Sequence, residues 1–251
     1  MDARERREAY ERDGWVLVPR LVGARKVRAL DLAAQDLVKA AAHLERDATI
    51  RGARYHVQSA SGRGGEAAIS PGTFRKITFA AALGPAFARL ITDARIAAVV
   101  ASIGLPSARC VVDQVNLKAA RVGTGFPWHQ DARFLTSRQQ EMVARDGGVN
   151  LVVAIDRSDA GNGGFEVLSG THLGGPVEFD YDTSGTNAGL FDESGRTLVP
   201  LDPGDAVLFH PYLAHGSGPN HSDAPRRLFA MWFIGRGAPD ARRPAAASPA
   251  G

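Results

Sequence analysis

The chain has a single cysteine, Cys110, among its 251 residues, so no disulfide bond can form within it. Residues 1–7 are polar and lack the apolar core of a secretory signal peptide. No apolar run reaches the roughly 18 residues that a membrane helix requires, and the nearest, residues 96–105, is interrupted by serine and glycine. These absences predict a soluble, cytoplasmic protein without a membrane partner.

Aromatic residues make up only 7% of the chain and do not alternate with basic residues along any segment. A nucleic-acid-binding surface typically shows such alternation along one element. The formal net charge of +3 arises largely from arginines near the two ends. We therefore expect a slightly basic, solvated surface and no nucleic-acid partner.

Hydrophobic residues account for 44% of the chain, enough for one sizeable core. Residues 1–107 are mostly typical of helices around a few short strands, whereas residues 108–237 form short β-rich runs separated by Gly, Pro, Asn and Asp. We predict one domain over residues 1–237: an all-β core of the double-stranded β-helix type, a jelly-roll or cupin-like barrel, with flanking helices. Residues 238–251, rich in Ala and Pro, are predicted to be disordered.

Hydrophobic periodicity and turn residues place the elements within these two parts. The predicted helices are 4–12, 24–44, 86–91 and 93–102. The predicted strands are 15–18, 110–121, 149–155, 164–168, 197–199, 205–209, 213–216 and 227–234. Alternation along strand 110–121 puts Gln114, Asn116 and Lys118 on one face, where they are expected to line the barrel mouth. Residues 174–196 show no periodicity and are expected to form a lid.

A possible metal site begins at His129 and Asp131. Residues i and i+2 of an extended strand end point the same way, so one nitrogen and one carboxylate oxygen can bind the same ion. A second histidine would complete a set of two histidines and one carboxylate, which leaves three positions open on an octahedral metal and suits non-haem Fe(II). The candidates are His210, His215 and His221. His215 is preferred because Arg226 follows it by eleven positions.

Five landmarks, which include these residues, occur in a recognisable order. They are Asn116-Leu117-Lys118, Trp128-His129-Gln130-Asp131, Asn162-Gly163-Gly164 leading to Ser169-Gly170-Thr171-His172, Gly204-Asp205, and His215-Gly216-Ser217 through Arg226. Together they resemble the phytanoyl-CoA dioxygenase family of Fe(II)/2-oxoglutarate-dependent oxygenases, from about residue 13 to about residue 233. The family more often has Pro-Gly-Ser-His where this chain has Ser-Gly-Thr-His, a change that leaves the turn intact.

The resemblance implies a set of site residues. The catalytic iron ligands would be His129, Asp131 and His215. Arg226 would bind the distal carboxylate of 2-oxoglutarate through two parallel hydrogen bonds, and dioxygen would be the second cosubstrate. Ser217 and Ser222 could donate to the same carboxylate, and weaker candidates for cosubstrate contacts are Gln130, Lys118 and Lys76. Adjacent strand residues face opposite ways, so Arg226 and Arg227 cannot both enter the barrel.

The expected activity is hydroxylation, or another oxidation, of an unactivated C–H bond. The carboxylate at position 131 disfavours halogenation, because halogenating relatives have a small residue there. We expect a small polar metabolite, such as an amino acid or a natural-product intermediate, as substrate, since polar side chains gather along the predicted pocket wall. These are Gln114, Asn116, Arg133, Arg54 and His56. The alternatives are an acyl-CoA hydroxylase of the same family, a cupin-type metal enzyme that does not use 2-oxoglutarate, and an inactive binding barrel. The sequence leaves the oligomeric state open.

Overall fold

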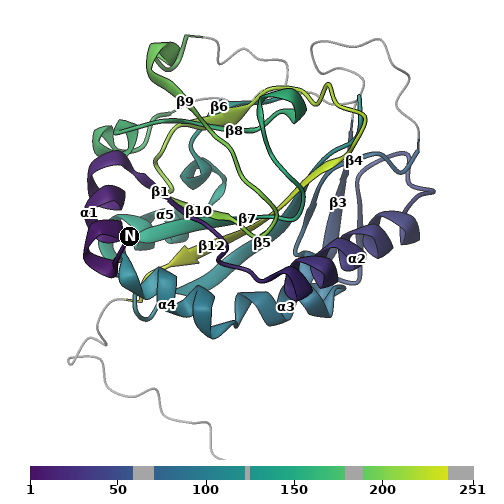
Figure 1. Cartoon of the computed structure of the whole chain (residues 1–251), viewed down its shortest axis with the longest axis horizontal. Helices are drawn as coiled ribbons and strands as arrows, with labels where there is room; N and C mark the ends of the chain where they lie inside the picture. The colour runs from purple at the N-terminus through teal and green to yellow at the C-terminus, as the bar shows by residue number, and fades with distance from the viewer. Residues whose placement is uncertain (59–70, 122–124, 179–188, 237–251) are drawn as a thin grey trace, which may run out of the picture.

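Two antiparallel sheets face each other at the centre of the fold (Figure 1). The computed structural model describes residues 1–58, 71–121, 125–178 and 189–236. The larger sheet has eight strands in the order β1-β10-β7-β12-β5-β4-β3-β2, and the smaller sheet has four in the order β6-β11-β8-β9. This is the all-β core with flanking helices that the sequence predicts.

The strand bounds follow from alternating apolar runs that end at turn residues. The larger sheet comprises β1 (Trp15–Val18), β2 (Ala48–Ile50), β3 (Ala53–Val57), β4 (Phe74–Thr78), β5 (Arg109–Lys118), β7 (Gly148–Ala154), β10 (Ala206–Phe209) and β12 (Arg226–Ile234). The smaller sheet comprises β6 (Phe126–His129), β8 (Phe165–Leu168), β9 (Arg196–Val199) and β11 (His215–Ser217).

Strand β12 lies in the middle of the larger sheet, paired with β5 on one side and β7 on the other. Its register with β5 begins at Arg226 opposite Lys118, and its register with β7 places Trp232 opposite Asn150. Because side chains alternate between faces, every second residue from Arg226 to Trp232 shares one face. That face is directed at the smaller sheet.

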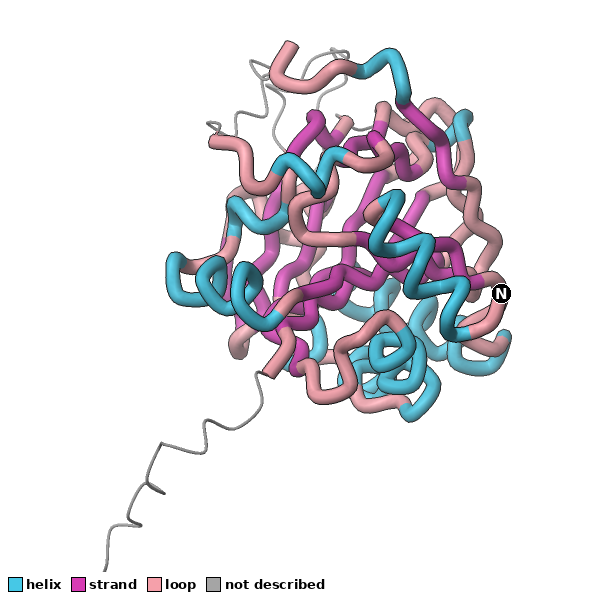
Figure 2. The backbone as a smooth tube through the Cα atoms, turned by 90° about the vertical axis from the view of Figure 1, so that its left-hand side faces the viewer, coloured by secondary structure: helices cyan, strands magenta, loops and turns pink. Residues whose placement is uncertain are grey.

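The helices lie outside this pair of sheets, with α2, α3 and α4 below the larger sheet in Figure 1. In Figure 2 the strands fill the middle of the molecule and most helices lie at its periphery. The α-helices are α1 (Ala3–Asp13), α2 (Ala24–Ala40), α3 (Pro85–Ile91), α4 (Ala94–Ser102) and α5 (Ser137–Asp146). The short 3-10 helices are η1 (Ala80–Ala82), η2 (Asp131–Phe134), η3 (Ala160–Asn162), η4 (Thr171–Gly174) and η5 (Glu193–Gly195).

Local sequence explains where these helices begin and end. Asp2 and Glu5 form a capping box at the start of α1, and Gly14 ends the helix in a left-handed conformation. Asp93 caps α4 by accepting a hydrogen bond from the Arg95 backbone. Helix α2 buries a stripe of four apolar residues against the larger sheet: Val27, Leu30, Ala34 and Leu37. Within the described residues, no helix combines the length and the apolarity needed to cross a membrane.

The core has two main parts. One lies between the helices and the outer face of the larger sheet, and it includes Leu30, Ile77, Phe87 and Phe229. The other lies between the sheets and includes Phe165, Phe209 and Leu213. The second part supports one side of a pocket that opens between the two sheets.

The structure adds elements that the sequence analysis did not predict. Strands β2, β3, β4 and β6 and helix α5 are new, and β1 to β4 show that residues 1–107 supply four strands of the larger sheet. Helix α2 ends at Ala40, four residues before the predicted end. The predicted lid, residues 174–196, falls partly within residues 179–188, and the predicted tail within residues 237–251; both stretches lie outside the described residues.

Candidate active site

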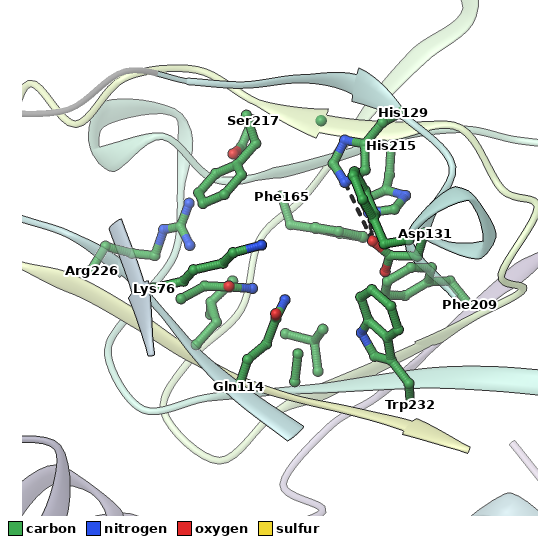
Figure 3. A pocket seen from close by; sticks show the side chains of 17 residues that line it. Lys76, Gln114, His129, Asp131, Phe165, Phe209, His215, Ser217, Arg226 and Trp232 are labelled. Atoms are coloured by element: carbon green, nitrogen blue, oxygen red, sulfur yellow. Dashed lines mark ion pairs between the residues drawn. The ribbon is translucent and has the colours of Figure 1, made fainter. Parts of the chain in front are cut away.

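His129, Asp131 and His215 come together where the smaller sheet meets the pocket (Figure 3). His129 ends β6, Asp131 begins η2, and His215 begins β11 directly opposite His129 in the register. The Asp131 Oδ1 atom lies 3.4 Å from His129 Nε2 and 3.6 Å from His215 Nε2. All three side chains are buried, and their ligand atoms lie within 4.8 Å of one another. One ion could therefore contact all three.

Both histidines are held in the tautomer that a metal requires. His129 Nδ1 lies 2.6 Å from the carbonyl oxygen of Pro127, and His215 Nδ1 lies 2.9 Å from that of Leu213. A carbonyl oxygen can only accept, so each Nδ1 carries the proton and donates. Each Nε2 then carries the lone pair of the ring and lies near Asp131 Oδ1, as in metal-ligating histidines.

Charge and burial also suit cation binding. Burial lowers the pKa of His129, an effect that His215 increases, and this favours the neutral imidazole. For Asp131, burial would raise the pKa, but the neighbouring histidines outweigh it and hold that pKa well below its usual range. At ordinary pH the site thus presents a neutral His129 imidazole and an ionised Asp131 carboxylate.

Asn150 on β7 orients the metal-facing carboxylate. Its Nδ2 donates a 2.6 Å hydrogen bond to Asp131 Oδ2, and its side chain is almost fully buried. The other oxygen, Oδ1, is the one that faces the two histidines. The two oxygens of Asp131 therefore have different partners.

The pocket extends from this triad along the inner face of the larger sheet and has a volume of about 60 Å³. Both sheets contribute to its walls, which combine polar side chains with aromatic and aliphatic ones. It is lined by Lys76, Gln114, Asn116, Phe126, His129, Asp131, Phe134, Val152, Phe165, Phe209, His215, Gly216, Ser217, Arg226, Leu228, Ala230 and Trp232. Figure 3 shows Arg226 and Trp232 on opposite sides of this space.

Arg226 is a buried cation at one end of the pocket. Its Nη2 donates to the carbonyl oxygen of Gly163 at 2.5 Å, while its Nε is buried without a hydrogen-bond partner among the described residues. Burial lowers the pKa of Arg226 to about 9 despite the opposing field of Asp156. An anionic ligand would relieve this burial cost.

Lys118 adds a second buried cation beside Arg226. Its Nζ donates to Ser217 Oγ at 2.8 Å and to the carbonyl oxygen of Gly218. Burial lowers the pKa of Lys118 well below its usual range, and the nearby Arg226 lowers it further. This end of the pocket is electropositive.

Arg227 points the other way, as strand alternation predicts. It forms ion pairs of 2.8 Å with Asp31 and 2.7 Å with Asp156. Arg226 enters the pocket and Arg227 packs against α2.

The remaining predicted residues divide into two groups. Lys76, Gln114, Asn116 and Ser217 line the pocket. The structure does not bring the others into its lining, and these are Gln130, Ser222, Lys118, Arg54, His56 and Arg133.

Several of the residues outside the lining have partners elsewhere. The Gln130 amide bonds Gly175, Val177 and Tyr212. The Ser222 hydroxyl donates within its own turn to Asn220 Oδ1. His56 lies 3.1 Å from Asp47 and 3.2 Å from Thr78. Arg54 and Arg133 lie near Asp47 and Glu178 respectively, at 3.9 Å each. Their proposed contacts with ligands stay predictions.

His210 belongs to a separate cluster. Its Nδ1 accepts a hydrogen bond from the Tyr212 backbone, and its ring packs near those of Tyr10 and His172. Burial lowers the pKa of His210 to about 4. His172 Nε2 lies 3.1 Å from the carbonyl oxygen of Glu11.

The sequence analysis missed two residues of the site: Asn150, which bonds Asp131, and Trp232, which lines the pocket. Asn150 is the one polar residue of β7, a strand that is buried throughout. A buried amide needs hydrogen-bond partners, so a lone polar residue in an apolar strand was a usable signal. Trp232 occurs in an apolar run, where nothing in the sequence distinguishes it from a core residue.

Comparisons with known proteins agree with this geometry. The peroxisomal phytanoyl-CoA dioxygenase of Rattus norvegicus is 35% identical over 115 residues, which cover 43% of this chain and 32% of that protein. L-proline trans-4-hydroxylase of Streptomyces griseoviridis is 29% identical over 142 residues, which cover 47% of this chain and 51% of that protein. The chain therefore aligns with only about a third to a half of these curated relatives.

A solved structure matches over nearly the whole chain. It is EctD from S. alaskensis with 2-oxoglutarate and 5-hydroxyectoine, with a TM-score of 0.68 and 26% identity over 94% of this chain and 76% of that one. The family model for phytanoyl-CoA dioxygenase (PhyH) matches residues 10–228. Because this match spans both sheets and all three triad residues, the chain belongs to the phytanoyl-CoA dioxygenase family.

Proposed function

We propose that this protein is an Fe(II)- and 2-oxoglutarate-dependent dioxygenase that hydroxylates, or otherwise oxidises, an unactivated C–H bond of a small polar metabolite. The observation that carries the proposal is a buried His129, Asp131 and His215 triad sharing one pocket with a buried, incompletely bonded Arg226. The first group suits a metal ion, and the second suits a carboxylate.

The donor set fits iron. Two neutral imidazole nitrogens and one carboxylate oxygen on one side of the site would hold Fe(II) and leave positions open for small ligands. Dioxygen would be the oxidant, and bound iron would let it react: one oxygen atom would go to the substrate and the other to succinate, as 2-oxoglutarate is oxidised and loses carbon dioxide. The protein's part is to hold these groups and exclude water.

The electropositive end of the pocket fits the distal carboxylate of 2-oxoglutarate. Arg226 can offer two parallel donors to it, and the unpaired Nε shows that donor capacity remains. Ser217 lines the same pocket, and Lys118 holds its hydroxyl by a 2.8 Å hydrogen bond. Lys76 also lines the pocket and could contact a carboxylate of the cosubstrate.

Aromatic side chains pack around the metal ligands. The His215 ring centroid lies 4.7 Å from that of Phe209 and 5.4 Å from that of Phe165, and Phe134 lies 5.6 Å from His129. Such packing fixes the imidazole planes and keeps bulk water away from the reacting atoms.

Polar walls support a small polar substrate over a hydrocarbon chain. Gln114 and Asn116 line the pocket, and Asn116 Oδ1 is buried without a partner among the described residues. Apolar substrates would leave such groups unpaired at a cost of about 1 to 3 kcal/mol each. The similarity to an L-proline hydroxylase and to EctD, whose structure contains 5-hydroxyectoine, is consistent with this choice.

Two alternatives make different predictions. An acyl-CoA hydroxylase, as the rat relative's name suggests for that protein, would respond to acyl-CoAs alone. A cupin-type enzyme without 2-oxoglutarate would have no role for Arg226.

Succinate release tests the proposal. The purified protein, loaded with Fe(II) and supplied with 2-oxoglutarate and oxygen, is incubated with panels of free amino acids, other small metabolites and acyl-CoAs. We expect stimulation by a member of the small-metabolite panels and a product heavier by one oxygen atom. Stimulation by acyl-CoAs alone would show that the protein is an acyl-CoA hydroxylase. Turnover without 2-oxoglutarate would show that it belongs to the cupin-type enzymes that do not use this cosubstrate.

A further inference from the structure

Trp232 is a pocket residue with an unused hydrogen-bond donor. Its side chain is only 5% exposed and lines the pocket. Its indole Nε1 is buried with no hydrogen-bond partner among the described residues. Buried donors are normally paired, so an orphan donor at a pocket wall calls for a ligand. In Figure 3 the indole nitrogen faces the interior of the pocket.

The register puts Trp232 at the far end of the pocket from Arg226. Both lie on the inner face of β12, six residues apart, which at about 3.3 Å per residue is roughly 20 Å. Trp232 pairs with Asn150, the residue that bonds Asp131. The triad carboxylate is therefore anchored to the Trp232 end of the sheet, while the proposed cosubstrate anchor is at the other end.

Apart from Asp131, the polar groups at the Trp232 end of the pocket are uncharged. Gln114, which pairs with Ala230, is its nearest polar neighbour on the inner face of β5. The backbone positions of the two cations that line the pocket are farther along the sheet. One is Arg226 itself, and the other is Lys76, which pairs with Asn116 opposite Leu228 and interacts with the Asp131 carboxylate. An anionic group at Trp232 would compete with Asp131 and 2-oxoglutarate for Lys76 and the bound metal, whereas an uncharged acceptor needs no such partner.

We propose that Trp232 is a specificity-determining residue whose indole N–H donates to an uncharged oxygen of the substrate, a carbonyl or a hydroxyl. This inference rests on the proposed function and narrows its substrate class to small molecules that carry such an oxygen at the end distant from the cosubstrate. An indole N–H can only donate. A substrate without an acceptor at this position would leave the donor buried and unpaired.

Four small ring compounds test this directly: cyclopentanone, cyclopentanol, cyclopentanecarboxylate and cyclopentane. Their dissociation constants are measured by ligand-detected NMR titration against anaerobic protein loaded with Fe(II) and 2-oxoglutarate. In the wild type, the ketone and the alcohol should bind roughly 2- to 13-fold more tightly than cyclopentane, the range expected for one net hydrogen bond. The carboxylate should not bind more tightly than they do.

Trp232→Phe should abolish the preference for the ketone and alcohol while keeping a ring at this position. Trp232→Tyr, which restores a donor on a ring, should recover part of it. Trp15→Phe is the matched control, because the Trp15 indole donates to Ser169 outside the pocket lining. That variant should retain the full preference. Thermal unfolding of each variant checks that it folds.

Two results would overturn the inference. The first is that Trp232→Phe still binds the ketone and alcohol more tightly than cyclopentane. The second is that the wild type binds the carboxylate most tightly and that Trp232→Phe loses this binding. The first result would show that Trp232 does not recognise the substrate oxygen. The second would show that the indole N–H donates to a charged oxygen. Iron content and 2-oxoglutarate binding are measured on the same samples. If the wild type fails to bind 2-oxoglutarate, the proposed function fails, whereas the dependence of ring binding on Trp232 is still read from the titrations.

Discussion

Asn150 Nδ2 donates to Asp131 Oδ2 at 2.6 Å, and this bond selects Oδ1 as the oxygen that faces the two histidines. A carboxylate held by one oxygen is pre-organised to bind a metal through the other. Asn150 comes from the larger sheet, whereas both histidines come from the smaller one. The metal site is thereby tied to both layers of the fold.

Replacing Asn150 by leucine should weaken Fe(II) binding about 10- to 100-fold, since this is the usual effect of removing an outer hydrogen bond to a metal ligand. Anaerobic metal titration measures the change. Thermal unfolding of the metal-free protein serves as the control, because a purely structural role would lower stability without a selective loss of metal affinity. Unchanged affinity would show that Asp131 needs no orientation by Asn150.

His215→Ala should abolish iron binding, whereas His210→Ala should retain both metal and measurable turnover. The reason is position: His215 Nε2 faces Asp131, while His210 packs near Tyr10 and His172. Metal content after anaerobic loading distinguishes them. The reverse pattern, with iron lost only in His210→Ala, would mean that the third ligand is assigned wrongly.

Arg226→Gln should raise the dissociation constant of 2-oxoglutarate by roughly 30-fold or more, because a desolvated carboxylate loses its charged partner. Equilibrium binding of 2-oxoglutarate to the iron-loaded protein measures this. Arg227→Gln is the matched control on the same strand. It breaks the ion pairs with Asp31 and Asp156, so it should lower stability while leaving 2-oxoglutarate affinity near the wild-type value.

Gly163→Ala should disturb the Arg226 end of the pocket. Gly163 has a φ of +73°, and an added Cβ would lie 2.3 Å from the Gly218 carbonyl oxygen and 2.7 Å from Lys118 Nζ. Gly170 has a similar φ of +79° but open space around it, so Gly170→Ala should cost only about 1 kcal/mol of left-handed strain. Chemical denaturation should show the larger loss for Gly163→Ala, together with weaker 2-oxoglutarate binding. Equal losses of stability in the two variants would mean that the structure accommodates the added Cβ at Gly163 without disturbing the pocket.

Stability should fall between about pH 6.5 and pH 4 because of His210. Its pKa is lowered to about 4 in the folded protein by burial, with a smaller effect of His172, whereas an unfolded histidine titrates near 6.5. In this window the unfolded chain binds the extra proton, so acidification favours unfolding by up to about 3 kcal/mol. Denaturation at several pH values measures the slope. His210→Gln should flatten it, and a wild-type slope in that variant would assign the effect to other groups.

Much of the fold follows from local pattern. The predicted strand 15–18 coincides with β1, and the predicted strand 227–234 differs from β12 by one residue, because long apolar runs with clear turn residues identify their own ends. The short strand β6 was missed, since Phe126–His129 is only four residues long and contains a proline. Its pairing with β11 depends on contacts far apart in the chain.

The candidate site divides in the same way. Motif spacing predicted His129, Asp131 and His215 and selected Arg226 over Arg227, and the structure brings these four side chains to one pocket. Their roles as ligands stay predictions. As the lone polar residue of an apolar strand, Asn150 could have been expected to need a partner. Its contact with Asp131 and the place of Trp232 could not be predicted, because both depend on the β7–β12 register that sets the two residues side by side. Arg54 and His56 on β3 were expected in the pocket wall. In the fold, β4 lies between β3 and β5, and Lys76 on β4 lines the pocket.

The central position of β12 bears on how enzymes with this architecture can diversify. One strand, hydrogen-bonded along both edges, carries Arg226 near its start and Trp232 near its end. A substitution at position 232 changes one end and leaves the other in place. Inserting or deleting a single residue between them would turn one of the two side chains to the opposite face. Along this strand, point substitutions can therefore change the substrate while the cosubstrate anchor stays in place. Changes in strand length would disrupt the pocket, so we expect length variation in the connecting loops.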